Sequence, residues 1–167
     1  MSAAAGASSG VAAARAPGAA SAAAPGDVGT FLASDPTRHR ARLTLLAGLG
    51  NENGGFNFDG YGRGRLLVEI PLGWQVVVDC ENRGTTRHSC AIVKGSLATR
   101  PAFAGATSPK PLTGLAPGAR ISFSFRATRR GSFRIACLVP GHEQARMWDV
   151  LDVVGGNRPA ISARAGP

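Results

Sequence analysis

Short apolar runs separated by turn-forming residues make up most of this chain, from about residue 41 to residue 154. Gly, Pro and Asn bound each run, and no run keeps a helical period for three turns. This pattern predicts an all-β sandwich, with at most one short helix near residues 97–103. The predicted strands cover residues 41–47, 56–58, 65–70, 75–81, 88–93, 119–127, 132–137 and 149–154.

Two of these predicted strands show strict alternation of large apolar and polar residues. Large side chains fall on one face in 121–125, and in 132–137 the same period places Cys137 on the face of Phe133 and Ile135. Only residues 128–131, which contain Arg129-Arg130-Gly131, separate the two strands. We therefore expect a β-hairpin that carries the Cys137 thiol to one end of the sandwich.

The two ends of the chain differ in composition from this region. The first 30 residues are mostly Ala, Gly, Ser and Pro, which bury too little apolar surface to offset the entropy of ordering. An Ala-rich helix is the alternative, but Gly and Pro interrupt it every few residues. We expect a disordered Ala/Gly-rich tether over residues 1–38, a domain over 39–155 and a flexible tail over 156–167.

The segment that follows the strand ending at Cys137 contains residues that bind metals. Cys137, His142 and Met147 are spaced so that one loop can direct all three side chains at one atom, and His88 follows a turn far upstream. A thiolate, two imidazoles and a thioether form the ligand set of mononuclear blue-copper sites. Each residue alone has an ordinary structural explanation, as a small buried thiol, a core methionine or a surface histidine. Together they predict one copper ion.

Three segments resemble a known family. Residues 56–60 (Phe-Asn-Phe-Asp-Gly), 70–74 (Ile-Pro-Leu-Gly-Trp) and 137–149, with Pro-Gly-His inside, are similar to the sulfocyanin group of the cupredoxins, the type 1 blue copper proteins. The resemblance covers about residues 42–155. It implies a Greek-key β-sandwich, outer-sphere electron transfer and a single copper cycling between Cu(I) and Cu(II). The implied ligands are His88, Cys137 and His142 in equatorial positions and Met147 in the axial position.

The sequence departs from this family at two neighbours of ligands. Many cupredoxins have Asn after the first histidine, where its side chain ties the ligand loops together, whereas this chain has Ser89, as rusticyanins do. The resemblance to rusticyanin implies a raised reduction potential. Arg146 is a large cation directly before Met147, where the family tends to have small residues, and it is expected to affect access or docking.

The two other cysteines, Cys80 and Cys90, lie on either side of a turn at predicted inward positions. An oxidising compartment would favour a disulfide between them, and simple burial of two thiols is the alternative. His39, in a run of arginines, has no ligand spacing and is expected to be solvated. The glycines at 60–64 superficially match a dinucleotide fingerprint but open no helix, so we expect a turn there.

The chain is strongly basic, with a formal net charge of +9. Such charge suits nucleic acid, an anionic membrane or an acidic protein. The scattered aromatics give no support for nucleic-acid binding. We expect a monomer with an acidic redox partner, such as a cytochrome or an oxidase, near Arg83, Arg87 and Arg146, although these arginines could equally form a solubilising surface. The N-terminal tether would allow association with a membrane surface.

Histidine counting separates the function classes. Copper oxidases and nitrite reductases need several more histidines, and only His39 remains after His88 and His142 are assigned, so we expect no enzyme activity. The expected function is single-electron transfer in an extracytoplasmic respiratory chain. The alternative is a copper storage or delivery module. No signal peptide is visible and no apolar run is long enough to span a bilayer, so the periplasmic or cell-exterior location is inferred from the chemistry and the resemblance.

Overall fold

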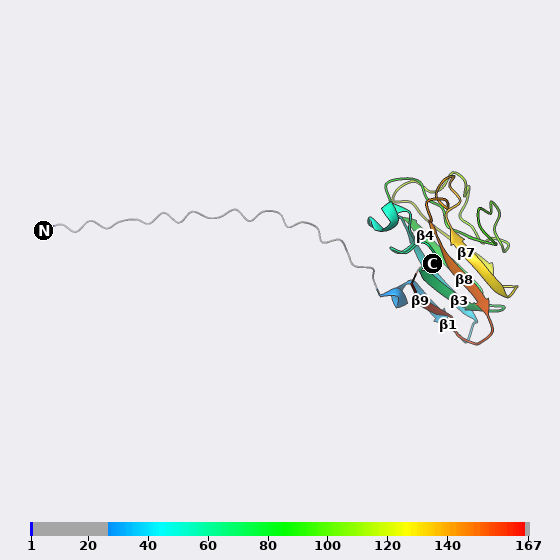
Figure 1. Cartoon of the computed structure of the whole chain (residues 1–167). Helices are drawn as coiled ribbons and strands as arrows, with labels where there is room; N and C mark the ends of the chain where they lie inside the picture. Colours follow the sequence, from blue (N-terminus) through cyan, green and yellow to red (C-terminus); the bar gives the residue numbers. More distant parts are fainter. Residues whose placement is uncertain (2–26, 166–167) are drawn as a thin grey trace.

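A computed structural model describes residue 1 and residues 27–165 of the chain (Figure 1). Two short 3-10 helices and nine strands lie in this part. The helices are η1 (Val28–Phe31) and η2 (Glu52–Gly55). The strands are β1 (Leu32–Asp35), β2 (Arg40–Ala47), β3 (Leu66–Pro71), β4 (Gln75–Asn82), β5 (Ala91–Val93), β6 (Arg120–Arg126), β7 (Gly131–Ala136), β8 (Trp148–Val154) and β9 (Ala160–Ala163).

The strands form two sheets that pack as a sandwich, which confirms the predicted fold class. One sheet has the order β1-β2-β4-β6 and the other has the order β5-β7-β8-β3-β9. Figure 1 shows β7, β8, β3 and β9 side by side in the second sheet. The pairs β2–β4 and β3–β8 are parallel, and the remaining pairs are antiparallel.

The core lies between the sheets and follows the two-residue period of the strands. In β2 and β4, alternate side chains are buried along the whole strand. Phe103 from the long loop after β5 packs against Phe125 of β6 and Phe133 of β7, with ring centroids 5.2 and 4.7 Å apart. Because β6 and β7 belong to different sheets, this aromatic group joins the two layers. Burying each such ring contributes roughly 2–3 kcal/mol.

The predicted hairpin between residues 119–127 and 132–137 is wrong. β6 pairs with β4 in one sheet, whereas β7 pairs with β5 and β8 in the other. The turn between them therefore crosses from sheet to sheet. Alternation fixes which face of a strand is buried, but it does not select the partner strand. The inward orientation of Phe133, Ile135 and Cys137 is nevertheless as predicted.

Other elements differ from the predictions more locally. Residues 56–58 form no strand, although Phe58 makes isolated bridges to Ala47 and Tyr61. The strand predicted from His88 begins at Ala91, because the N–H groups of Ser89 and Cys90 donate to the side chains of Cys137 and Ser108 and not to a neighbouring strand. Residues 97–103, where the sequence allows at most one short helix, form turns and bends.

Two strands lie outside the predicted domain bounds of 39–155. β1, within the predicted tether 1–38, pairs with β2, and β9, within the predicted tail 156–167, pairs with β3. Both are four-residue edge strands of mostly small or polar residues, so their sequences carry little strand signal. Most of the predicted tether, residues 2–26, lies outside the described residues. Within the described part, no helix is long and apolar enough to cross a membrane.

Candidate metal centre

Three metal-ligating side chains from distant parts of the sequence meet at one end of the sandwich. His88, Cys137 and His142 offer ligand atoms that all lie within 4.8 Å of one another. Cys137 Sγ is 3.3 Å from His142 Nδ1 and 4.0 Å from His88 Nδ1. Cys137 directly follows β7, so the strand direction carries the thiol to this end.

The arrangement of these donors fits a small metal ion. Nitrogen and sulfur ligands about 2.0 and 2.3 Å from one ion in trigonal or tetrahedral geometry would lie about 3.5–3.7 Å apart. The two observed nitrogen–sulfur distances fall on either side of this range. Together with the buried thioether of Met147, the donor set is the one typical of a type 1 copper site.

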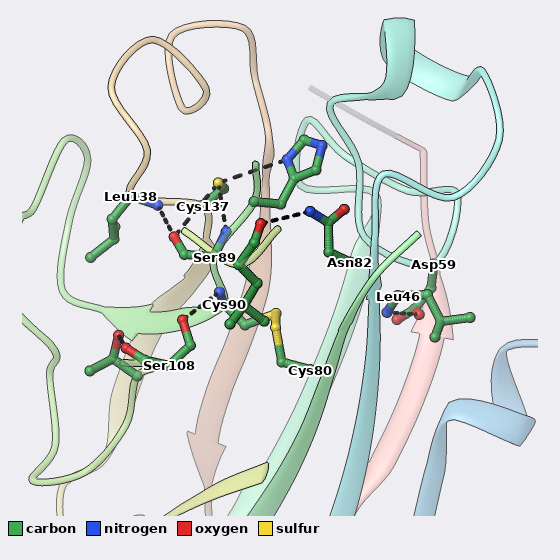
Figure 2. Close-up of a disulfide and its surroundings, with 12 residues drawn as sticks. Leu46, Asp59, Cys80, Asn82, Ser89, Cys90, Ser108, Cys137 and Leu138 are labelled. Atoms are coloured by element: carbon green, nitrogen blue, oxygen red, sulfur yellow. Dashed lines mark hydrogen bonds between the residues drawn. A yellow bond between two sulfur atoms is a disulfide. The ribbon is translucent and has the colours of Figure 1, made fainter. Parts of the chain in front are cut away.

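Ser89 connects the two segments that bring the ligands together. Its backbone N–H donates to Cys137 Sγ at 3.2 Å, and its hydroxyl oxygen lies 3.7 Å from the same sulfur. The hydroxyl also accepts a hydrogen bond from the Leu138 N–H at 2.9 Å. Figure 2 shows Ser89, Cys137 and Leu138 gathered in this way. Ser89 therefore ties the segment that holds His88 to the segment that holds Cys137.

The loop from Cys137 to Met147 is closed by hydrogen bonds within itself. The Cys137 N–H donates to Met147 O at 3.3 Å, and the Met147 N–H donates to His142 O at 3.0 Å. Pro140 and Gly141 turn the chain, and Gly141 adopts a φ of 89°. Met147 is fully buried. Its role as the axial ligand remains a prediction from the spacing and the resemblance.

Two glycines make room for the imidazole of His88. A Cβ on Gly48 would lie 2.9 Å from His88 Nε2, and a Cβ on Gly84 would lie 2.8 Å from the same atom. Thr86 Oγ1 is 3.3 Å from this nitrogen. Backbone hydrogen bonds between His88 and Leu115 fix the main chain, at 2.7 and 3.3 Å. Nδ1 is thus the ring nitrogen that faces Cys137.

Burial sets the protonation of the three ligands. Desolvation, with a smaller contribution from the neighbouring His142, lowers the pKa of His88 to about 4. Desolvation also lowers the pKa of His142. Both imidazoles are therefore neutral near pH 7, the state that binds a metal. Desolvation raises the pKa of the Cys137 thiol, although hydrogen bonds from Ser89 and Val139 oppose this shift.

Phe56 is a residue at the metal centre that the sequence identified only as part of a motif. Its ring meets His142 edge-on at a centroid distance of 4.9 Å and His88 at 6.3 Å. The ring thus packs against both imidazoles and limits their rotation. Gly48 and Gly84 were not identified either, because their importance arises only from the close approach of His88.

Cys80 and Cys90 form a disulfide, which decides between the two alternatives that the sequence left open. Cys80 lies in β4 of one sheet, and Cys90 directly precedes β5 of the other. Figure 2 shows the bridge beside the segment that holds Ser89. The disulfide therefore links the two layers of the sandwich two residues away from His88.

Three other features noted in the sequence, Arg146, His39 and the glycines at 60–64, do not contact the ligand atoms of the metal centre. Arg146 is exposed with a φ of 66°, and its carbonyl accepts a hydrogen bond from the Arg63 N–H. His39 is exposed and lies 5.6 Å from Trp74, outside the ligand cluster. The glycine-rich stretch at 60–64 follows a tight turn at Asp59 and Gly60, as expected for a turn-forming sequence.

Comparisons with known proteins give the same family as the residue pattern. Residues 32–107 match the family described as "Sulfocyanin (SoxE) domain". A sulfocyanin from Sulfolobus acidocaldarius is 26% identical over 121 residues, which cover 65% of this chain and 61% of that protein. The match thus covers less than two thirds of the length of this relative.

Solved structures with similarity to this chain include a blue copper oxidase and an auracyanin. The blue copper oxidase from Nitrosomonas europaea is 23% identical with a TM-score of 0.54, over 71% of this chain and 40% of that chain. An auracyanin from Roseiflexus castenholzii is 21% identical with a TM-score of 0.47, over 68% of this chain and 96% of that chain. At these identities, the likeness to the oxidase supports the fold alone.

Proposed function

Because this chain carries a sulfocyanin (SoxE) domain with the cupredoxin fold, we propose that it transfers single electrons between redox partners in an extracytoplasmic respiratory chain. The observation that carries the proposal is the buried cluster of His88, Cys137 and His142. We assign Nδ1 of both histidines, Sγ of Cys137 and the thioether of Met147 as the copper ligands. Copper bound there would supply reversible one-electron exchange between Cu(I) and Cu(II).

A rigid, mostly buried ligand set supports electron transfer. His88 is 2% exposed, and Cys137 and Met147 are 0% exposed, so packing holds three ligands in one arrangement. Little reorganisation of the protein is then needed when the charge changes. His142 is half-buried and is the ligand side chain that reaches furthest toward solvent. We assign its ring edge as the electron port, with Val139 and Pro140 as an apolar rim.

A copper storage or delivery role fits the same residues less well. Delivery requires that copper leave readily, whereas here the ligands lie within a packed and hydrogen-bonded end of the sandwich. An enzyme with further copper centres is disfavoured by histidine number, since the 167 residues contain three histidines and the proposed site uses two.

The redox partner that we propose is acidic. Arg87 and Arg146 are exposed near the metal centre, and neither forms an ion pair within the described residues. Arg83 is less available because its guanidinium binds Glu81 at 2.6 Å. Exposed charges of this kind mainly accelerate association. Arg87→Glu should slow electron transfer with an acidic cytochrome at low salt, and no change would count against an acidic partner.

The Cys80–Cys90 disulfide supports a location outside the cytoplasm, because such bonds persist in oxidising compartments. The deciding experiment for the function is a visible spectrum after addition of Cu(II). We expect an intense thiolate-to-copper charge-transfer band, lost in Cys137→Ser, and a reversible one-electron potential. A colourless protein that binds Cu(II) weakly, or one that loses copper rapidly to a mild chelator, would contradict electron transfer at this site.

A further inference from the structure

The end of the sandwich opposite the metal centre is formed by four short turns. β8 begins at Trp148, next to Met147, and ends at Val154, about 20 Å away along the strand (Figure 1). At that end lie the turns between β1 and β2, β3 and β4, β6 and β7, and β8 and β9. We call the surface of these turns the distal face. It comprises residues 36–39, 72–74, 127–130 and 155–159, with one flanking residue on each side of each turn.

Hydrogen bonds connect the turns of the distal face into one surface. The Leu72 N–H donates to Val154 O at 2.9 Å, and the Gly73 N–H donates to Ala127 O at 2.8 Å. The side chain of Arg126 also donates to Gly73 O, at 2.7 Å. The turn at 72–74 is thus bound to the turns on either side of it. The face is held in place by the ends of both sheets.

Arginine dominates the charge of the distal face. Its turns and flanking residues contain a single acidic residue, Asp35, and six arginines, which gives a net charge of +5 out of +9 for the whole chain. All six arginines are exposed. They are Arg38, Arg40, Arg126, Arg129, Arg130 and Arg158.

Most of these arginines have no acidic partner. Arg38 pairs with Asp35 at 2.8 Å, and the other five form no ion pair with any described residue. Elsewhere in the domain, Arg42 pairs with Asp79 and Arg134 with Glu143. The distal face therefore keeps a concentrated positive charge that the protein itself does not neutralise.

A single apolar side chain projects from the middle of this charge. Leu72 lies in the turn between β3 and β4 and is 44% exposed. The same turn contains Trp74, which is only 3% exposed. The cores of protein–protein interfaces are depleted in charge and rich in aromatic side chains. The distal face lacks such a core, because its turns carry one exposed large apolar side chain and no exposed aromatic ring of Phe, Tyr or Trp. Arginine is common in protein interfaces as well as on phosphate-binding surfaces, so the missing apolar and aromatic core is what favours a membrane surface.

We propose that the distal face binds the surface of an anionic membrane. Guanidinium groups form paired hydrogen bonds with phosphate, and each basic residue near an anionic bilayer contributes about a fivefold increase in partitioning. Leu72 would enter the headgroup region among the arginines. In this orientation the metal centre faces away from the bilayer, and His142 stays accessible to a soluble partner.

The test measures binding of the full, copper-loaded chain to vesicles by sedimentation. Phosphatidylcholine vesicles with about 30% phosphatidylglycerol are compared with pure phosphatidylcholine at low and high salt. We expect binding to the anionic vesicles alone, and loss of that binding as salt rises. Absence of binding to anionic vesicles at low salt would overturn the proposal.

A pair of double variants separates the distal face from the total charge. Arg130→Glu with Arg158→Glu changes two distal arginines, and Lys110→Glu with Arg146→Glu makes the same change of charge near the metal centre. No described side-chain hydrogen bond is lost in either variant. The distal variant should bind at least about 25-fold more weakly. An equal loss in both variants would assign binding to net charge and overturn the proposal.

Leu72→Ser distinguishes a bilayer from an acidic protein. The substitution leaves the charge unchanged and should weaken vesicle binding about fivefold, because an apolar side chain no longer enters the headgroup region. Strong binding to polyglutamate together with vesicle binding that is unaffected by Leu72→Ser would favour an acidic protein and overturn the membrane assignment. The copper absorption band reports that each variant is folded, and it tests the metal centre independently of vesicle binding.

Discussion

The backbone of the ligand loop, residues 137–147, is turned by hydrogen bonds within the loop, although side-chain contacts also tie it to other segments, whereas the backbone of His88 pairs with a segment far away in the sequence. In the loop, the N–H groups of His142 and Ala145 donate to carbonyls three and four residues earlier. Around His88, Gly84 and Thr86 are near in sequence, but Gly48 and Leu115 are 40 and 27 residues away. One half of the site is thus encoded locally, and the other half depends on the complete fold.

The largest effect is expected on the His88 side, from Gly48→Ala. The new Cβ would lie 2.8 Å from Gly84 Cα and 2.9 Å from His88 Nε2, at a residue with a φ of 75°. Crowding and backbone strain together should lower the free energy of unfolding by about 4 kcal/mol. Copper binding should weaken because His88 is displaced. Chemical denaturation and copper titration measure the two effects.

Gly50→Ala is the matched control for this substitution. Gly50 has a φ of 64°, and a Cβ there would meet no atom within 4 Å. In this variant only the strain of a left-handed backbone conformation should lower the free energy of unfolding, by about 1 kcal/mol, and the copper affinity should stay unchanged. Equal losses in Gly48→Ala and Gly50→Ala would mean that the space beside His88 does not matter.

Removal of the Cys80–Cys90 disulfide tests how strongly the fold supports the His88 side. The two cysteines are separated by 10 residues in the sequence. Without the bridge the unfolded chain gains conformational entropy, so the free energy of unfolding should fall by about 3 kcal/mol. The variant is Cys80→Ala with Cys90→Ala, measured by urea denaturation of the apoprotein. An unchanged free energy of unfolding would show that the bridge adds nothing to the packing of the two sheets.

The counterpart on the ligand loop is Glu143→Gln. Glu143 accepts a hydrogen bond from the Leu97 N–H at 2.8 Å and pairs with Arg134 at 2.5 Å. Glutamine can keep the first contact through its amide oxygen but loses the second, because its amide NH2 cannot accept from the Arg134 guanidinium, so the expected loss in the free energy of unfolding is about 1–2 kcal/mol. A loss larger than that of the disulfide variant would reverse the proposed difference between the two halves.

The sequence predicted the locally encoded half better than the other half. The spacing of Cys137, His142 and Met147 identified the loop because three ligands lie within eleven residues. His88 was identified as the fourth ligand, but not the glycines that make room for it. Their role depends on contacts between strands, and strand pairing cannot be read from alternation alone. The same limitation explains the wrong hairpin between β6 and β7.

A pH dependence of stability is expected from Asp59, a buried carboxyl beside the His88 half. Desolvation raises its pKa well above the usual value, despite a hydrogen bond from the Leu46 N–H at 2.7 Å. The unfolded chain therefore loses this proton at lower pH than the folded protein. The free energy of unfolding should fall as pH rises above about 4, until the folded carboxyl also ionises, with a slope of up to about 1.4 kcal/mol per pH unit.

Asp59→Asn should remove this contribution, because asparagine resembles the neutral carboxyl and still accepts from Leu46. Denaturation of the apoprotein at several pH values would show a smaller slope, with a remaining part from Asp149, whose pKa desolvation raises to about 8. Asp35→Asn is the control. A hydrogen bond from Arg38 lowers the pKa of Asp35, so this carboxyl makes the free energy of unfolding rise with pH, and its removal should change the slope in the opposite direction. An unchanged slope in Asp59→Asn would show that Asp59 ionises normally.

The smallest expected effect concerns Ser89, which joins the two halves. Its hydroxyl accepts from the Leu138 N–H and can direct its own proton toward Cys137 Sγ, 3.7 Å away. A donor to the sulfur favours the reduced site, so Ser89→Ala should lower the reduction potential by roughly 40 mV if the bond is worth about 1 kcal/mol. Ser108→Ala removes a buried hydroxyl that accepts from the Cys90 N–H at 3.3 Å, and it should leave the potential unchanged. Equal shifts in both variants would mean that the potential responds to general loosening of this segment, and that the Ser89 hydroxyl has no specific effect on the sulfur.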